Sequence, residues 1–215
     1  MLTSLPAPRY PSASFQALRD HIGQVNLDDL VCCFLFFRQN PTYNSTPPLP
    51  QCPSTNNVTR IHMFHSATAT FCAPSNPSGV GGSYRESIRC TPRWQTANII
   101  APQHDCILLN TNPDTAGMRG LDVARVHLFS FELGDKLLSC ALVHNFSKSF
   151  NKPEPDNGMW VVEPNIDNHG YQVMSVMHID SIVCAAHLLP VFKGDAAIPR
   201  NVNKHVDYHV FETLF

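Results

Sequence analysis

Hydrophobic and polar residues alternate through the middle of this chain, most regularly in two apolar runs between Leu121 and Phe146. The runs flank Gly134 and Asp135, and because glycine tolerates positive φ, this pair suits a two-residue hairpin turn. Such a turn predicts an antiparallel hairpin in which Arg125 lies opposite His144. An Arg opposite a His is unfavourable unless a carboxylate or solvent lies between them, so this pair predicts an anion or partner site, or an open sheet edge.

The apolar side of this predicted hairpin changes along its length. Residues near the turn share one face: Phe129, Phe131, Leu138 and Cys140. Residues farther from the turn lie on the opposite face: Ala124, Val126, Leu128, Ala141 and Val143. A flat sheet with one buried face would not change sides in this way. We therefore expect a curled sheet or a small, partly open barrel that is covered on different faces at its two ends.

Further strands are predicted on both sides of the hairpin, because the sequence there is rich in β-branched and apolar residues. They lie within residues 58–74, 105–111, 158–164 and 172–192, the last with a bend near Ile179 to Ser181. The C-terminal stretch from Asn201 to Phe215 suits either a short helix or an edge strand.

Two helices are predicted near the N-terminus. The first is capped by Ser12 or Ser14 and stops at Gly23, and the second starts after Asn26 and stops at Pro41. The second helix is apolar almost all round, so it must pack against the rest of the chain or against a partner.

These elements predict an α+β chain that is rich in β-strands. A segment rich in Pro, Ser, Thr and Asn follows the second helix. We therefore expect an N-terminal helical segment with its linker at 1–57, a β-rich domain at 58–197 and a tail at 198–215.

Composition restricts the partners. Charged residues make up 15% of the chain, against about a quarter in an average domain, and the formal net charge is −2. A nucleic-acid-binding chain usually carries a basic footprint, so only a local patch is left for DNA. No apolar run approaches the roughly 18 residues of a membrane span, and the first residues do not resemble a secretory signal. We expect a nuclear or cytoplasmic chain, with no membrane partner and with reduced, buried thiols.

Three groups of side chains are candidates for chemistry. His205, Asp207 and His209 would point the same way on a strand and could ligate a metal, although the sequence identifies no further ligand and surface histidines are the alternative interpretation. A basic group that suits an anion or DNA consists of Arg85, Arg89, Arg93 and Trp94, with a solvated surface as its alternative interpretation. No Ser-His-Asp or Cys-His set can be assembled, so we expect no cofactor and lean against catalysis.

Four segments in sequence order resemble the C-terminal region of large proteins encoded by Plavaka-type and related DNA transposons of mushroom-forming fungi. They contain the strings FHSATATFCAPSNPSGVGG, DCILLNTNPDTAGMRGLDVARVHLFSF, CALVHNFS with DNGMWVVEPN, and VMHIDSIVCAAHLLPVF with VNKHVDYHVFE. The resemblance covers about residues 58–215. It implies a stand-alone copy or a remnant of that module, with transposase chemistry located elsewhere in the large relatives.

The order of predicted strands also resembles, more distantly, the bromo-adjacent homology domain, a β-rich module that binds proteins and often chromatin. Two departures matter. Asn145 stands where the transposon-encoded relatives tend to have Trp, and in the tail His205 replaces an aromatic residue while Tyr208 replaces a histidine. The first departure weakens an aromatic recognition surface, and the second weakens the metal site.

The leading expectation is a non-catalytic interaction module, derived from a fungal DNA transposon, that binds protein or chromatin partners. Its partner-binding residues are expected on the sheet surface: Arg125, His144, Phe146 and Trp160. One alternative is a metal-dependent hydrolase or nuclease that uses the His/Asp cluster of the tail. The other is a DNA-binding transposase accessory that uses the basic group.

Overall fold

The structure is a computed structural model that describes residues 2–4, 10–13, 15–43, 61–72, 83–95, 100–133, 139–189 and 213–214. The predicted turn at Gly134 and Asp135 lies outside these residues. Two long antiparallel strands form the centre of the fold, β8 (Leu121–Leu133) and β9 (Cys140–Lys148).

The pairing of β8 with β9 confirms one part of the predicted register and corrects another. Arg125 lies opposite His144, as predicted. Between Val126 and Leu128 the register shifts, so His127 is an extra residue in β8. Beyond this β-bulge Phe129 pairs with Ala141. A two-residue turn at Gly134 and Asp135 predicts Cys140 as the partner of Phe129, so the predicted register near the turn is wrong by one residue.

The bulge explains why the apolar side of the predicted hairpin changes along its length. An extra residue reverses the alternation of side chains in β8. As a result Ala124 and Val126, which precede the bulge, and Phe129, which follows it, all pack in one buried cluster. Ala141 and Val143 of β9 belong to the same cluster, so the apolar face continues across the bulge.

As far as the described residues go, the sheet around β8 and β9 is curled but not closed. Its core follows the order β12–β7–β8–β9, and β9 then pairs with β11 along its first half and with β10 near its end. Their bounds are β7 (Cys106–Asn110), β10 (Trp160–Pro164), β11 (Met174–His178) and β12 (Ile182–Ala186). Strands β11 and β12 lie at opposite edges, yet only the short 3-10 turn η5 (Ile179–Ser181) joins them. The sheet must therefore curl, and the predicted bend is confirmed.

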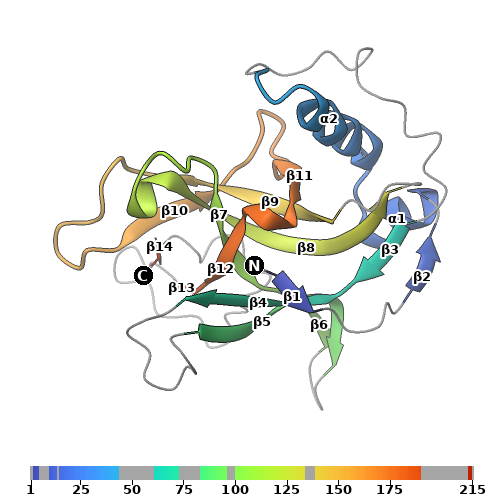
Figure 1. Cartoon of the computed structure of the whole chain (residues 1–215), viewed down its shortest axis with the longest axis horizontal. Coiled ribbons are helices and arrows are strands. Elements are labelled where there is room, and N and C mark those ends of the chain that lie inside the picture. Colours follow the sequence, from blue (N-terminus) through green and yellow to red (C-terminus); the bar gives the residue numbers. More distant parts are fainter. Residues whose placement is uncertain are drawn as a thin grey trace.

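A second antiparallel sheet packs against the first and follows the order β1–β4–β5–β6 (Figure 1). Its strands are β1 (Leu2–Ser4), β4 (Ser66–Cys72), β5 (Ser83–Gln95) and β6 (Ile100–His104). The chain passes between the sheets at His65, after β3 (Ile61–Phe64), and at Asp105, before β7. The backbone N–H of Ala185 in β12 donates to the Glu86 carboxylate in β5, which links the sheets again.

Short strands complete the larger sheet. At one end β2 (Tyr10–Ala13) pairs with β3, which pairs with β8. At the other end β14 (Thr213–Leu214) lies between β10 and β13 (Leu188–Leu189). For the tail, the two described residues thus form a strand, as one of the two predictions had it.

Two helices cover the larger sheet on the side away from β4 and β5 (Figure 1). They are α1 (Phe15–Ile22) and α2 (Leu27–Gln39). Gly23 has a φ of 67° and follows α1, as the stop signal predicted, and Asn26 occupies the N-cap of α2 without a side-chain capping bond. Helix residues Leu18, Leu27 and Val31 share a buried cluster with strand residues of β3, β8 and β9.

The apolar second helix therefore packs against its own chain. The predicted domain limits at 57 and 197 fall outside the described residues and stay predictions. Within the part of the chain that the structure describes, no helix is long and apolar enough to cross a membrane.

A tight corner joins β7 to β8 through the 3-10 turn η4 (Gly117–Gly120). The carbonyl of Gly120 accepts from the N–H groups of Thr111 (3.2 Å) and Asn112 (3.1 Å). A Cβ built on Gly120 would collide with the carbonyl oxygen of Thr115 and would lie 2.5 Å from that of Asn112. Only glycine fits this corner.

We expect Gly120→Ala to lower the free energy of unfolding by about 3 kcal/mol, because backbone atoms must move to admit the methyl group. Chemical denaturation measures the change. Gly158→Ala is the matched control, since Gly158 has a φ of 71° and no atom within 4 Å of the added Cβ. The control carries conformational strain alone and should cost about 1 kcal/mol. Equal losses in the two variants would contradict the close packing at Gly120.

Candidate functional site at the mouth of the curled sheet

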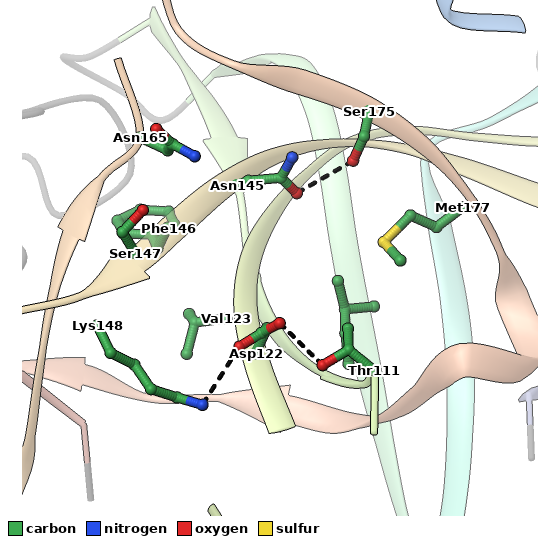
Figure 2. Close-up of a pocket in the computed structure, with 11 residues that line it drawn as sticks. Thr111, Asp122, Val123, Asn145, Phe146, Ser147, Lys148, Asn165, Ser175 and Met177 are labelled. Carbon is green, nitrogen blue, oxygen red and sulfur yellow. Dashed lines mark hydrogen bonds and ion pairs between the residues drawn. The ribbon is translucent and has the colours of Figure 1, made fainter. Parts of the chain in front are cut away.

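A pocket of about 480 Å³ opens at one end of the curled sheet (Figure 2). We call it the mouth pocket. Strands β7, β8, β9 and β11 supply most of its wall, and its lining residues are Leu109, Thr111, Asp122, Val123, Asn145, Phe146, Ser147, Lys148, Asn165, Ser175 and Met177. The pocket is therefore built from segments far apart in sequence.

One side of the mouth pocket is an ion pair with a fixed geometry. Thr111 Oγ1 donates to Asp122 Oδ2 at 2.8 Å, and Lys148 Nζ donates to Asp122 Oδ1 at 3.2 Å (Figure 2). Lys148 also lies over the Trp160 ring, with Nζ 5.7 Å from the ring centroid. Both carboxylate oxygens are thus engaged, and the negative charge of Asp122 is balanced by the ammonium of Lys148.

The opposite side of the pocket carries an amide and a hydroxyl. Ser175 Oγ donates to Asn145 Oδ1 at 3.0 Å (Figure 2). The backbone of Asn145 is held as well: its N–H donates to Val173 O at 3.0 Å, and its carbonyl accepts from Asn165 N at 2.9 Å. Met177 adds an apolar side chain to this wall. Asn145 is therefore oriented before any ligand arrives.

The lining suits binding by hydrogen bonds and apolar contact. It combines a neutralised carboxylate–ammonium pair, side-chain amides, hydroxyls and a thioether. No histidine or cysteine is among the described lining residues, so the lining holds no imidazole or thiol pair of the kind that activates a nucleophile.

A groove between α2 and β11 lies next to the mouth pocket. It has a volume of about 490 Å³ and is lined by Leu30, Cys33, Phe34, Phe37, Arg38, Met174, Ser175, Val176, Met177, His178 and Ser181. Ser175 and Met177 line both spaces. We call this second space the α2–β11 groove.

The structure corrects the expected location of the partner-binding residues. Arg125 is 1% exposed, His144 0%, Phe146 6% and Trp160 8%, so none of them lies on the sheet surface. It does bring them together. The guanidinium carbon of Arg125 lies 5.4 Å from the centroid of the Phe146 ring, and the His144 and Phe146 rings are 5.3 Å apart. These four residues lie on the face of β8 and β9 that α2 covers at one end and β10 at the other. Substituting any of them would therefore remove contacts in the core.

Histidines extend this buried polar cluster. The rings of His104 and His127 stack at 4.5 Å, and those of His127 and His144 lie 6.5 Å apart. Burial lowers the pKa of His127 to about 3, and the neighbouring His104, His144 and Arg125 act in the same direction. Burial also lowers the pKa of His144 to about 4, although its bond to Asn165 O opposes the shift. Both rings are therefore neutral at pH 7.

The basic group is partly described. Arg85 and Arg89 lie in the strand β5. Both side chains are exposed, and so is that of Ser87 between them. Alternate residues of a strand point to the same side, so the two arginines share one exposed face of β5. Arg93 and Trp94 continue the backbone of β5, but their side chains lie outside the described part.

The predicted metal ligands His205, Asp207 and His209 also lie outside the described residues. Among the residues that are described, no group of three or more His, Cys, Asp or Glu side chains is placed to hold a metal ion. Three of the described thiols are buried, those of Cys90, Cys106 and Cys140. Burial raises the pKa of Cys90 and of Cys106, and nearby Arg125 opposes the rise at Cys106.

Sequence reasoning did not find the mouth pocket. The sequence singles out Asn145 only as a departure from the transposon-encoded relatives, while Thr111 ends the strand predicted at 105–111 and Asp122 lies at the start of the predicted hairpin. The available signal was the placement of polar residues where apolar strands end. This signal does not reveal that the ends of the apolar runs in β7, β8 and β9 lie close together in the fold.

The buried histidines predict a loss of stability in acid. Below pH 6.5 the unfolded chain binds protons that folded His144 and His127 exclude, so the free energy of unfolding should fall as the pH drops from 6.5 toward 4. His144→Gln keeps a donor for Asn165 O and should reduce this fall by roughly 2 kcal/mol. Denaturant titrations at several pH values measure it. The exposed His187→Gln is the control, and the same pH slope in both variants would contradict the account.

The chain was compared with models of known protein families, with curated proteins and with solved structures, and none of the three comparisons gives a match.

Proposed function

We propose that this chain is a non-catalytic interaction module that binds a protein or chromatin partner in the nucleus through the mouth pocket. The observation that carries the proposal is the arrangement of polar groups around that pocket. Asp122 and Asn145 are each held by hydrogen bonds to neighbouring segments of the chain, at 2.8 to 3.2 Å. A site whose groups are already oriented loses less entropy on binding.

The chemistry of the pocket favours a peptide over a phosphate-bearing ligand. A phosphate would approach the Asp122 carboxylate, which repels it, while the only lining ammonium, among the described residues, already pairs with that carboxylate. Backbone amides and uncharged polar side chains of a peptide can instead bond to Asn145 and Ser175. Met177 supplies apolar contact beside them.

The resemblance described above supports the same proposal. We propose an origin in Plavaka-type or related DNA transposons, and we propose that the curled sheet is a partly open barrel of the bromo-adjacent homology type. In that assignment β8 is a strand near the start, β9 the central strand, and β11 to β12 the closing segment. Asn145 then replaces an aromatic residue in a position that lines the mouth pocket. Fold analogy alone does not give function, so binding must be tested directly.

The test is binding of the purified chain to recombinant mononucleosomes, to a histone-tail peptide array and to a phage-displayed random peptide library. We expect a protein probe whose affinity falls at least tenfold in Asn145→Ala and in Ser175→Ala, because each substitution breaks the bond between these side chains. The control is Lys152→Ala, an exposed residue outside the lining. Binding to no probe, or binding that both pocket variants leave unchanged, would overturn the proposal.

The exposed pair Arg85 and Arg89 favours a second candidate function, a DNA-binding accessory of a transposase. Each phosphate contact contributes about 0.9 to the slope of log affinity against log salt for duplex DNA. The double variant Arg85→Gln/Arg89→Gln should therefore lower that slope by about 2, and Lys152→Gln should leave it unchanged. Fluorescence anisotropy with a labelled duplex measures both, and absence of binding at low salt would end this candidate. The hydrolase alternative has no structural observation in its favour, because its residues lie outside the described part.

A further inference from the structure

Strand β11 exposes one row of backbone groups. The hydrogen bond from Asn145 N to Val173 O (3.0 Å) and the bond from Ile179 N to Ser139 O (3.1 Å) fix which residues bond to β9. Because hydrogen-bonded and non-hydrogen-bonded pairs alternate in an antiparallel ladder, the N–H and C=O groups of Ser175 and Met177 point toward β9. Those of Met174, Val176 and His178 point to the outer edge.

This outer edge has no partner strand within the described residues, where β11 pairs only with β9. The edge is short, five residues long, and every one of them is partly exposed. A strand edge of this kind is a template for an added strand from another chain.

The two hollow spaces lie on the two faces of β11. Met174 and Val176 pack against the cluster that contains α2, whereas Met177 packs against the barrel core on the other face. The α2–β11 groove and the mouth pocket share Ser175 and Met177. A strand added to the outer edge of β11 would therefore direct alternate side chains toward the groove and toward the mouth pocket.

The groove sets the chemistry of the side chains that face α2. Its α2 wall is apolar: Phe37 is 40% exposed, and Phe34, Leu30 and Cys33 are partly exposed. Arg38 is exposed beside Phe37 and is the one basic side chain other than His178 among the lining residues. Apolar side chains with one carboxylate complement this wall, while small or uncharged polar side chains complement the mouth pocket.

We infer that an extended peptide segment binds by adding a strand to the outer edge of β11. Its sequence alternates apolar residues, which enter the α2–β11 groove, with small or uncharged polar residues, which face the mouth pocket, and it carries an acidic residue for Arg38. The inference rests on the proposed function and gives the bound partner a conformation and a sequence pattern.

The test uses the strongest peptide selected from the random library on the full chain, with a fluorescent label. Strand addition uses every second amide of the peptide, so N-methylation at those amides should weaken binding at least thirtyfold. The same methylation at the intervening amides, the matched control, should change affinity less than threefold. On the protein, amide hydrogen exchange followed by NMR should slow at least tenfold at Val176 when peptide is added, while Ser175 and Met177, already bonded to β9, should change little.

Val176→Pro tests the edge from the protein side. Proline at this position removes an outward N–H and leaves the bonds of Ser175 and Met177 to β9 in place, so the variant should fold and lose the peptide. Val176→Ala is its control, because it also loses the valine side chain but keeps the N–H, and it should bind the peptide at least tenfold more tightly than Val176→Pro does. A melting curve checks that both variants fold, and the exchange at Val176 in the wild-type chain decides the question where Val176→Pro does not fold.

The outcomes separate the two proposals. A peptide that needs Asn145 and Ser175 but leaves exchange at Val176 unchanged overturns strand addition and leaves the interaction module standing. If the chain binds no nucleosome, histone-tail peptide or library peptide, both the proposed function and strand addition are overturned. If the chain self-associates and Val176→Pro abolishes the self-association, the edge binds a second copy of the chain. If duplex DNA displaces the peptide, the edge binds nucleic acid. Either result overturns the peptide inference.

Discussion

The β-bulge at His127 is the constraint on which the rest of the fold depends. In a regular strand, side chains alternate without exception, so Val126 and Phe129, three residues apart, would face opposite sides. The extra residue places them on the same side, and Ala124, Val126 and Phe129 share one core with Ala141 and Val143 of β9. A bulge also increases strand twist, which favours the curl that brings β11 and β12 within the reach of a three-residue turn.

The curl has two consequences for the central strands. Their inner face packs into the core between the two sheets, and their outer face is covered by α1 and α2 at one end and by residues around Phe146, Trp160 and Val162 at the other. Arg125 and His144 lie between these two outer clusters, where the cation is buried beside an aromatic ring and neutral imidazoles. At the end of the inner face, where apolar residues give way to Asp122, Asn145 and Thr111, the core opens into the mouth pocket.

Local sequence patterns predicted much of this fold. The stop signals at Gly23 and Pro41, the apolar run before Asn110 and the bend at Ile179 to Ser181 each depend on neighbouring residues, and the structure has these features. The bulge was missed because a fixed two-residue turn imposes one register on the whole hairpin. The partner-binding residues were placed on the surface because an Arg opposite a His resembles an open edge. Their burial depends on α2 and β10, which no local pattern connects with them, and the mouth pocket depends on the same long-range assembly.

The open edge of β11 and the incomplete closure of the sheet are two aspects of one feature. Exposed edges invite aggregation, and proteins usually protect them with lysine, proline or a covering element. The sequence of β11, Met-Ser-Val-Met-His, contains neither lysine nor proline. Helix α2 covers one face of the strand, and the described residues place no element along its edge. An edge that is short and bordered by a hollow on each face has the features of a surface that binds a partner strand. The same incomplete closure of the curled sheet leaves both the edge and the mouth pocket open.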